Sequence, residues 1–294
     1  MAVTIMDGGM GGEIQARLEG AGHGLWSAKA LVEAPQIVVD LHKQYIAAGA
    51  EIILTNSYST IPHYLGKEGL AEQFVEYTKL AGQLARQAVC ESDRTVQVAG
   101  SIPPLNESYR SDLVPSAEEA LPVYRSMVEA LQPYVDCYIC ETMSSADEAL
   151  NAAGQAVAHG GGKPVYVAWT LNERPGKGLR SGEPIAEAYG RVSHLGLAGF
   201  MFNCTSPEAI IAAIPQLRKF TDKPIGCYAN RMNEVSPEWT LDNEISTGRR
   251  ADLGTEHFVK MAQDCVASGA TIVGGCCGIG PQDIAALHEA LGAV

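Results

Sequence analysis

Gly274-Gly275-Cys276-Cys277-Gly278 is the stretch from which both the fold and the site can be read. It follows the largely β-branched run at 270–273 and precedes a helical pattern that opens at Pro281. Neighbouring side chains of a strand point to opposite faces, so two adjacent cysteines at a strand end are not both ordinary core residues. The flanking glycines permit a sharp turn that aims both sulfurs at one point. Two thiolates at one point predict a soft metal, zinc first, with at least one further ligand from elsewhere in the chain.

The same succession of strand, turn and helix recurs along the whole chain. Short apolar runs predict strands at 3–6, 51–54, 95–99, 137–140, 165–169, 199–202, 225–228 and 271–273. Helical patterns lie at 34–48, 70–92, 117–132, 145–159, 183–195, 206–219, 255–268 and 281–291. Continuous apolar runs are typical of parallel strands covered on both faces. Eight such units predict an α/β fold, a single (β/α)8 TIM barrel over residues 1–294, with a doubly wound open sheet as the alternative.

Composition excludes several function classes. The net charge is −13, with 21 Lys and Arg against 34 Asp and Glu, which argues against nucleic acid and anionic membrane surfaces as partners. No apolar run reaches 18 residues, and the first residues lack the basic region of a signal peptide. We therefore expect a cytoplasmic location, where the eight cysteines stay reduced and clustered ones bind metal or take part in catalysis.

In a barrel of this kind, the site lies beyond the C-terminal ends of the strands. Cys204 directly follows the sixth predicted strand and is the expected third ligand of the Cys276–Cys277 pair, because alternate strands contribute side chains to one layer. Three thiolates with an open fourth position are typical of a catalytic zinc site. The long connections 8–33 and 229–253 are expected to be functional loops.

The remaining cysteines are expected to pack rather than to bind metal. Cys90 and Cys265 lie in helical patterns, where a small buried thiol is the default, and Cys227 sits near a strand end as a bystander. Cys137 and Cys140 form a Cys-x-x-Cys, but inside a strand their side chains point to opposite faces. We therefore expect no metal or redox role for that pair.

Polar residues at other strand ends are candidates for substrate binding. Asp7 precedes Gly8 and Gly9, whose backbone amides are candidates to hold an anion. Glu141 follows an apolar strand, where an acid needs a partner, either a substrate ammonium group or a nearby Lys or Arg. Thr55 and Asn56 offer neutral hydrogen bonds to a ligand or to their own loop.

The chain resembles the zinc-dependent homocysteine S-methyltransferases over almost its whole length. That group includes S-methylmethionine:homocysteine methyltransferases, betaine:homocysteine methyltransferase and the homocysteine domain of methionine synthase. The motifs that carry the resemblance are the stretches 7–11, 55–58, 99–101, 141–142, 181–183, 203–204 and 274–278. Asn203-Cys204 together with Gly274-Gly275-Cys276-Cys277-Gly278 is its most specific part.

The resemblance implies a role for each candidate. The zinc cysteines are Cys204, Cys276 and Cys277. The amino group of homocysteine lies near Asp7 and Glu141, its carboxylate lies on amides near Gly8 and Gly9 with help from Thr55, and Asn203 orients the site. Two stretches depart from the pattern of the S-methylmethionine enzymes, namely Ile102-Pro103-Pro104-Leu105 and Tyr228-Ala229-Asn230. These two departures leave the identity of the methyl donor open, but not that of the thiol acceptor.

The resemblance implies the methylation of homocysteine sulfur to give methionine, with the thiol activated by Zn2+. A small sulfonium such as S-methylmethionine or S-adenosylmethionine is the first expected donor, because 294 residues leave no room for folate and cobalamin domains. Betaine, dimethylsulfoniopropionate or a corrinoid protein is the alternative donor. Tyr58, Tyr228 and Trp239 are candidates to face it. Competing hypotheses are a non-catalytic thiolate zinc protein and a metal-dependent lyase or aldolase barrel.

Overall fold

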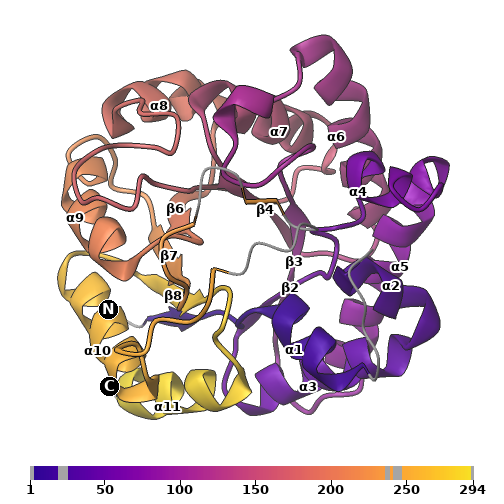
Figure 1. The fold of residues 1–294 in the computed structure, drawn as a ribbon, viewed down its shortest axis with the longest axis horizontal. Helices are drawn as coiled ribbons and strands as arrows, with labels where there is room; N and C mark the ends of the chain where they lie inside the picture. Colours follow the sequence, from indigo (N-terminus) through magenta and orange to yellow (C-terminus); the bar gives the residue numbers. More distant parts are fainter. Residues whose placement is uncertain (1–2, 19–25, 236–238, 241–246, 293–294) are drawn as a thin grey trace.

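Eight parallel strands lie side by side at the centre of the computed structural model, which describes residues 3–18, 26–235, 239–240 and 247–292. Their order is β1-β8-β7-β6-β5-β4-β3-β2, and a parallel bridge between Met6 and Ile52 joins the two ends of this order. The sheet therefore closes on itself, and helices surround it (Figure 1). The prediction of a (β/α)8 barrel is confirmed, and the doubly wound alternative is wrong.

The strands keep the predicted order but differ at their ends. They are β1 Thr4–Ile5, β2 Ile52–Leu54, β3 Gln97–Ile102, β4 Cys137–Met143, β5 Val165–Trp169, β6 Gly199–Asn203, β7 Ile225–Ala229 and β8 Ile272–Gly275. Both β3 and β4 run three residues further than predicted, so Ser101 and Glu141 lie inside strands. Polar residues suggested that these strands had ended, yet in a barrel the last inward positions of a strand line the site.

Each strand is followed by at least one helix. The helices are α1 Met10–Arg17, α2 Trp26–Glu33, α3 Pro35–Ala47, α4 Pro62–Gly66, α5 Phe74–Cys90, α6 Ala117–Leu131, α7 Ala146–His159, α8 Ile185–Val192, α9 Pro207–Leu217, α10 Thr255–Ala267 and α11 Pro281–Leu291. Short 3-10 turns lie at Ala71–Gln73, Ser111–Leu113 and Ser193–Leu195. The connection 8–33, expected to be a loop, contains α1 and α2; its residues 19–25 lie outside the described ranges.

Helix ends follow from local sequence. The Ser116 hydroxyl accepts from the Glu119 amide and the Glu119 carboxylate accepts from the Ser116 amide, a reciprocal cap that fixes the start of α6. Ser206 caps α9 by accepting from the Ala209 amide. Gly49 and Gly269, with φ of 110° and 111°, follow α3 and α10 in a conformation that L side chains avoid.

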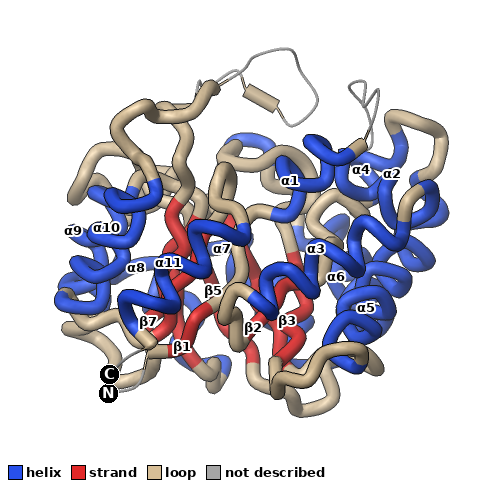
Figure 2. The backbone as a smooth tube through the Cα atoms, turned by 90° about the horizontal axis from the view of Figure 1, so that it is seen from below, coloured by secondary structure: helices blue, strands red, loops and turns tan. Residues whose placement is uncertain are grey.

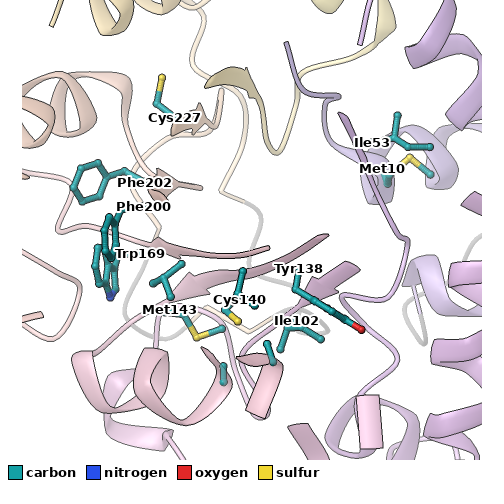
Figure 3. Packing of buried hydrophobic residues seen from close by; sticks show 14 of the residues in the cluster. Met10, Ile53, Ile102, Tyr138, Cys140, Met143, Trp169, Phe200, Phe202 and Cys227 are labelled. Atoms are coloured by element: carbon teal, nitrogen blue, oxygen red, sulfur yellow. The ribbon is translucent and has the colours of Figure 1, made fainter. Parts of the chain in front are cut away.

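Side chains of one strand alternate between two packing layers. Cys137, Ile139 and Met201 belong to the cluster inside the barrel. Tyr138 and Cys140 belong to the larger layer between strands and helices, where Trp169 stacks on Phe200 with ring centroids 5.8 Å apart (Figure 3). Cys137 and Cys140 therefore point to opposite faces, as predicted. Cys227 and Cys265 are buried, whereas Cys90 is exposed at the end of α5, contrary to the expectation of a buried thiol.

The two ends of the barrel carry different parts of the chain. The termini lie at one end, and α1, α2 and α4 lie at the other, beyond the C-terminal ends of the strands (Figure 2). In the described part of the 230–253 connection the only pairing is a bridge between Met232 and Arg249. No helix in the described ranges has the length and apolarity needed to cross a membrane.

Candidate active site

Three cysteines meet at the C-terminal end of the barrel. Cys204 directly follows β6, and Cys276 and Cys277 directly follow β8. The Cys204 Sγ lies 2.8 Å from the Cys276 Sγ and 3.6 Å from the Cys277 Sγ, and the three sulfurs lie within 4.8 Å of one another. Zinc–sulfur bonds of about 2.3 Å in a tetrahedron place sulfurs about 3.8 Å apart. The predicted convergence of these three thiols is thus present in the structure.

The chemistry of this donor set fits a soft metal. Among the described residues no fourth His, Cys, Asp or Glu joins the cluster. Hydrogen bonds from the Cys204 and Cys276 thiols lower the pKa of the Cys277 thiol, because they stabilise its charged form. Three sulfurs without another protein ligand suit a metal that keeps one position for a substrate.

Three non-glycine residues of the described chain adopt left-handed backbone conformations, and all three belong to this site. The φ angles are 66° at Tyr109, 60° at Thr142 and 49° at Cys204. Each such conformation costs about 1–3 kcal/mol and persists only where the surrounding structure enforces it. At Cys204 the turn directs the sulfur toward Cys276 instead of continuing the strand.

Two buried carboxylates line the same end of the barrel. Asp7 Oδ2 accepts from the Leu54 amide at 2.8 Å, and a Glu141 carboxylate oxygen accepts from the Ser101 hydroxyl. Burial raises the pKa of Asp7, and the neighbouring charge of Glu141 raises it further. Burial likewise raises the pKa of Glu141 to about 7. Neither carboxylate has an ion pair with a Lys, Arg or His in the described ranges, so the expected alternative of a salt bridge at Glu141 is wrong there.

Asn203 holds the end of β4. Its side-chain oxygen accepts from the Thr142 amide at 2.9 Å, and its amide nitrogen donates to the Thr142 hydroxyl at 2.8 Å. These two bonds stabilise the left-handed Thr142 and thereby fix the adjacent Glu141. Asn203 is fully buried, so within this structure it acts through its neighbours.

Thr55 and Asn56 are occupied by bonds within the protein. The Thr55 hydroxyl accepts from the Ser101 amide at 2.9 Å and lies 2.8 Å from the Ser57 hydroxyl. The Asn56 side chain donates to the Ser27 carbonyl at 2.9 Å and so ties the β2 end to α2. The hydrogen bonds of both side chains therefore hold the loop after β2 in place.

Gly8 and Gly9 have a packing function. A Cβ at Gly8 would lie 2.4 Å from the Ile279 carbonyl oxygen, and one at Gly9 would lie 2.6 Å from the Cys276 carbonyl oxygen. The Gly9 amide donates to the Ile279 carbonyl at 2.9 Å, so it is not free to bind an anion in this conformation. Both glycines therefore let β1 approach the turn that carries Cys276 and Cys277.

Aromatic side chains lie beside the thiols, and one of them, Tyr109, was not predicted from the sequence. The Tyr109 hydroxyl lies 2.9 Å from the Cys204 Sγ, and its ring centroid lies 5.5 Å from that of Trp239. Burial raises the pKa of Tyr109, which keeps its hydroxyl protonated. Tyr58 reaches the same loop through a 2.7 Å bond to Ser108, and the Tyr228 hydroxyl lies 3.5 Å from Glu141.

Tyr109 belongs to a loop without sequence periodicity, which is why the sequence did not single it out. The preceding Glu107 carboxylate lies within hydrogen-bond distance of His63, Tyr64 and Lys67, and it fixes this loop to α4. The available signal was a tyrosine shortly after the stretch that departs from the S-methylmethionine enzymes. Arg180, whose guanidinium lies 4.9 Å from the Tyr109 ring centroid, was also missed.

Comparison with known proteins agrees with this geometry. The family model described as homocysteine S-methyltransferase matches residues 4–291. The homocysteine S-methyltransferase of Escherichia coli (strain K12) is 31% identical, over 97% of this chain and 94% of that protein. The metallated crystal form of the E. coli homocysteine methyltransferase MmuM superposes with a TM-score of 0.82 at 28% identity, covering 98% of this chain and 96% of that one. A selenocysteine methyltransferase of Astragalus bisulcatus is 28% identical over 98% of this chain and 92% of that protein. The chain belongs to the homocysteine S-methyltransferase family.

Proposed function

We propose that this enzyme transfers a methyl group from a small onium donor to the sulfur of L-homocysteine, with zinc held by Cys204, Cys276 and Cys277. The observation that carries the proposal is the pairing of two unlike groups in one site. Three thiols lie beside two buried carboxylates that lack a cation among the described residues. Homocysteine carries a thiol for the first group and an ammonium for the second.

The acceptor end rests on Asp7 and Glu141. Two buried like charges in one site are unfavourable, and a ligand ammonium between them removes the penalty. Asn203, which directly precedes Cys204, holds Thr142, which directly follows Glu141, so this carboxylate and the thiols lie at neighbouring strand ends. Gly8, Gly9 and Thr55 support this end by packing and loop geometry, whereas Asn56 and Asn203 hold α2 and Thr142 in place.

The metal end rests on the three cysteines. When bound, zinc supplies the chemistry that deprotonates a coordinating thiol near neutral pH. The left-handed Cys204 aims its sulfur at the other two, and loading would require the Cys204 and Cys276 sulfurs, now 2.8 Å apart, to separate by about 1 Å. The Tyr109 hydroxyl, 2.9 Å from the Cys204 Sγ, donates to that sulfur once it is a thiolate and moderates its charge.

The donor end rests on the aromatic side chains. Tyr109 and Trp239 present rings within 5.5 Å of each other, and ring faces attract an onium cation. In the transfer homocysteine loses its thiol proton, the bond from the methyl carbon to sulfur or nitrogen of an onium donor (to cobalt of a corrinoid) breaks, and the sulfur–methyl bond of methionine forms while the donor atom keeps the electron pair. S-methylmethionine is the first donor to test, followed by S-adenosylmethionine, dimethylsulfoniopropionate, betaine and a methyl-corrinoid protein.

The test is methionine formation by reduced, zinc-loaded protein given homocysteine with each donor in turn. Turnover that disappears on chelation and returns with Zn2+ supports the proposal. Selenocysteine serves as a second acceptor because a relative is named for it. Absence of methionine with every donor, from protein that carries one zinc per chain, would refute the proposal and favour a non-catalytic thiolate site.

A further inference from the structure

The turn that carries Cys276 and Cys277 is closed by an ion pair that contributes no sulfur to the site. On one side of the turn the Arg231 amide donates to the Cys277 carbonyl at 2.9 Å. On the other side Asp283 Oδ2 accepts from the Gly280 amide at 2.9 Å. Arg231 Nη2 donates to Asp283 Oδ1 at 2.7 Å, so backbone and side chains together form one closed ring around the turn.

This ring leaves the turn after β8 little freedom. Gly278, inside the ring, has a φ of 83°, and a Cβ there would lie 3.2 Å from the Arg231 Cβ. The Cys276 amide donates to the last carbonyl of β7 at 2.9 Å, so the residue before the ring is bound as well. The Thr255 hydroxyl, at the start of α10, donates to Asp283 Oδ1 at 2.6 Å and orients the carboxylate. The turn is therefore held by the end of β7, by the start of α11 and by the ion pair between them.

A buried ion pair is a costly way to hold a turn. The Asp283 side chain is fully buried and that of Arg231 is 12% exposed, so both charges have lost most of their contact with water. The Arg231 Nε is also buried and has no hydrogen-bond partner among the described residues. Desolvation offsets much of the attraction between two buried charges, and an apolar pair of similar volume is often as stable. Global stability alone does not account for this pair, which points to a role in the turn that it encloses.

A second ion pair in the same connection lacks these contacts. The Arg250 guanidinium bonds to Glu208 at 2.8 and 2.9 Å and to Asp252 at 2.6 and 3.1 Å. Glu208 belongs to α9 and Asp252 to the connection itself, so neither carboxylate is part of the turn after β8. Ion pairing by itself therefore does not distinguish Arg231, whereas the ring around the turn does.

We infer that Arg231 and Asp283 are positioning residues for the metal site. They act through the turn after β8, which they hold in the conformation that directs both of its cysteines toward Cys204. The inference rests on the proposed metal site and goes beyond it, because neither side chain is one of the three ligands. Ordering a mobile turn on binding costs conformational entropy, which a turn already held in place does not pay. Outer partners that fix metal ligands typically change metal affinity by roughly 10- to 100-fold.

The test is the zinc affinity of the reduced full-length protein, measured by competition with a chromophoric chelator. Asp283→Asn keeps the size of the side chain and an oxygen for the Gly280 amide but removes one charge, and Arg231→Gln removes the other. We expect each variant to bind zinc about ten-fold more weakly than the wild type. The double variant should lose at most about three-fold more than the weaker-binding single variant, because the two side chains act as one unit.

Arg250→Gln is the matched control and should keep the wild-type zinc affinity, because its ion pairs lie outside the ring. The melting temperature of each metal-free protein is measured on the same preparation. A purely structural role for the Arg231–Asp283 pair would lower the melting temperature and leave the zinc affinity of the folded protein unchanged. If Arg231→Gln does not fold at the assay temperature, Asp283→Asn against the same control decides the question.

Three results would overturn the inference: wild-type zinc affinity in folded Asp283→Asn, fully additive losses in the double variant, or an equal loss of affinity in Arg250→Gln. Failure of the proposed function has different signatures. A wild type that binds no zinc would refute the metal site itself, and the inference with it. A wild type that binds zinc but forms no methionine would remove only the reaction and leave the role of the ion pair standing.

Discussion

Two cysteine pairs lie in the same barrel, but only one of them brings its sulfur atoms together. Cys137 and Cys140 lie within β4, three residues apart, one in the barrel interior and the other between strands and helices. Cys276 and Cys277 are neighbours, yet both reach Cys204 because they lie one and two residues beyond β8, in a turn flanked by glycines. Inside a regular strand, successive side chains point to opposite faces, so neighbouring cysteines can converge only where the strand has ended. Position relative to the strand end therefore decides which cysteines meet.

The largest expected effect comes from removing one sulfur of the converging set. Cys277→Ala should leave two thiols, lower zinc content to a small fraction of one per chain and reduce methionine formation at least about 1,000-fold, because the nucleophile loses its activation. Zinc by mass spectrometry and the initial rate are measured on the same preparation. A variant that forms methionine at the wild-type rate without zinc would remove the metal from the mechanism.

The next effect tests the acceptor side of the site. Glu141→Gln should reduce methionine formation about 100-fold, since the ammonium group loses a buried charged partner. The substrate-free variant should be more stable at pH 8 by about 1–3 kcal/mol, because a buried charge is gone. Glu148→Gln is the matched control: Glu148 is also buried with a pKa near 7, but it caps the Ser144 backbone and should leave the rate unchanged. Equal losses in both variants would indicate a general packing defect.

A pH series measures the same carboxylate without mutation. Burial raises the pKa of Glu141 from its usual 4.5 to about 7, so in the free protein it is protonated below pH 7. Its burial penalty is absent below pH 4.5, grows between 4.5 and 7, and is complete above 7. Binding of homoserine, which has the backbone groups of homocysteine but no thiol, should weaken about five-fold from pH 7 to pH 6, because the ionised fraction of Glu141 falls by that factor, and Glu141→Gln should flatten the profile. A flat wild-type profile from pH 7 down to pH 6 would mean that Glu141 does not meet the ammonium.

A smaller effect is expected at the hydroxyl that touches the thiol set. Tyr109→Phe keeps the ring against Trp239 and removes only the bond to Cys204. We expect a three- to ten-fold lower kcat with zinc content unchanged, and a similar KM for the donor, because the ring that faces it remains. A large rise in donor KM would instead place the hydroxyl itself in the donor site.

The smallest functional effect belongs to the pair inside β4. Cys140→Ala removes a buried sulfur and should lower the free energy of unfolding by about 1–2 kcal/mol, while zinc content and rate stay at wild-type values. Urea denaturation and metal analysis test both statements. Loss of zinc in this variant would show that packing around β4 affects the turn after β8.

The barrel could be predicted from the sequence because each strand, turn and helix is marked by residues close together in the chain. Eight short apolar runs, each followed by a turn and a helical pattern, fix the order of elements, and the order fixes which ends meet. Cys204 could be matched to Cys276 and Cys277 for the same reason. Strand ends were less accurate: Gly100-Ser101 and Glu141-Thr142 suggested termination, whereas tertiary pairing continues both strands.

The donor side resisted prediction because it depends on contacts between distant loops. Tyr109, which contacts Cys204, follows a loop that Glu107 attaches to His63 and Lys67, 40 to 44 residues earlier in the chain. Arg180 has no nearby sequence partner that marks it as different from a surface arginine. The hydrogen bond of the Gly9 amide could not be predicted for a related reason, because its acceptor, the Ile279 carbonyl, comes from the other end of the sequence.

The left-handed backbone at Tyr109, Thr142 and Cys204 has an evolutionary consequence. Glycine would relieve the torsion at each position, so only a demand for the side chain keeps these residues in place. In a descendant barrel that no longer performs the reaction, mutation toward glycine or asparagine at the three positions would meet little resistance. Replacement of all three residues in a related sequence would therefore indicate that the activity has been lost, even where the rest of the fold is retained.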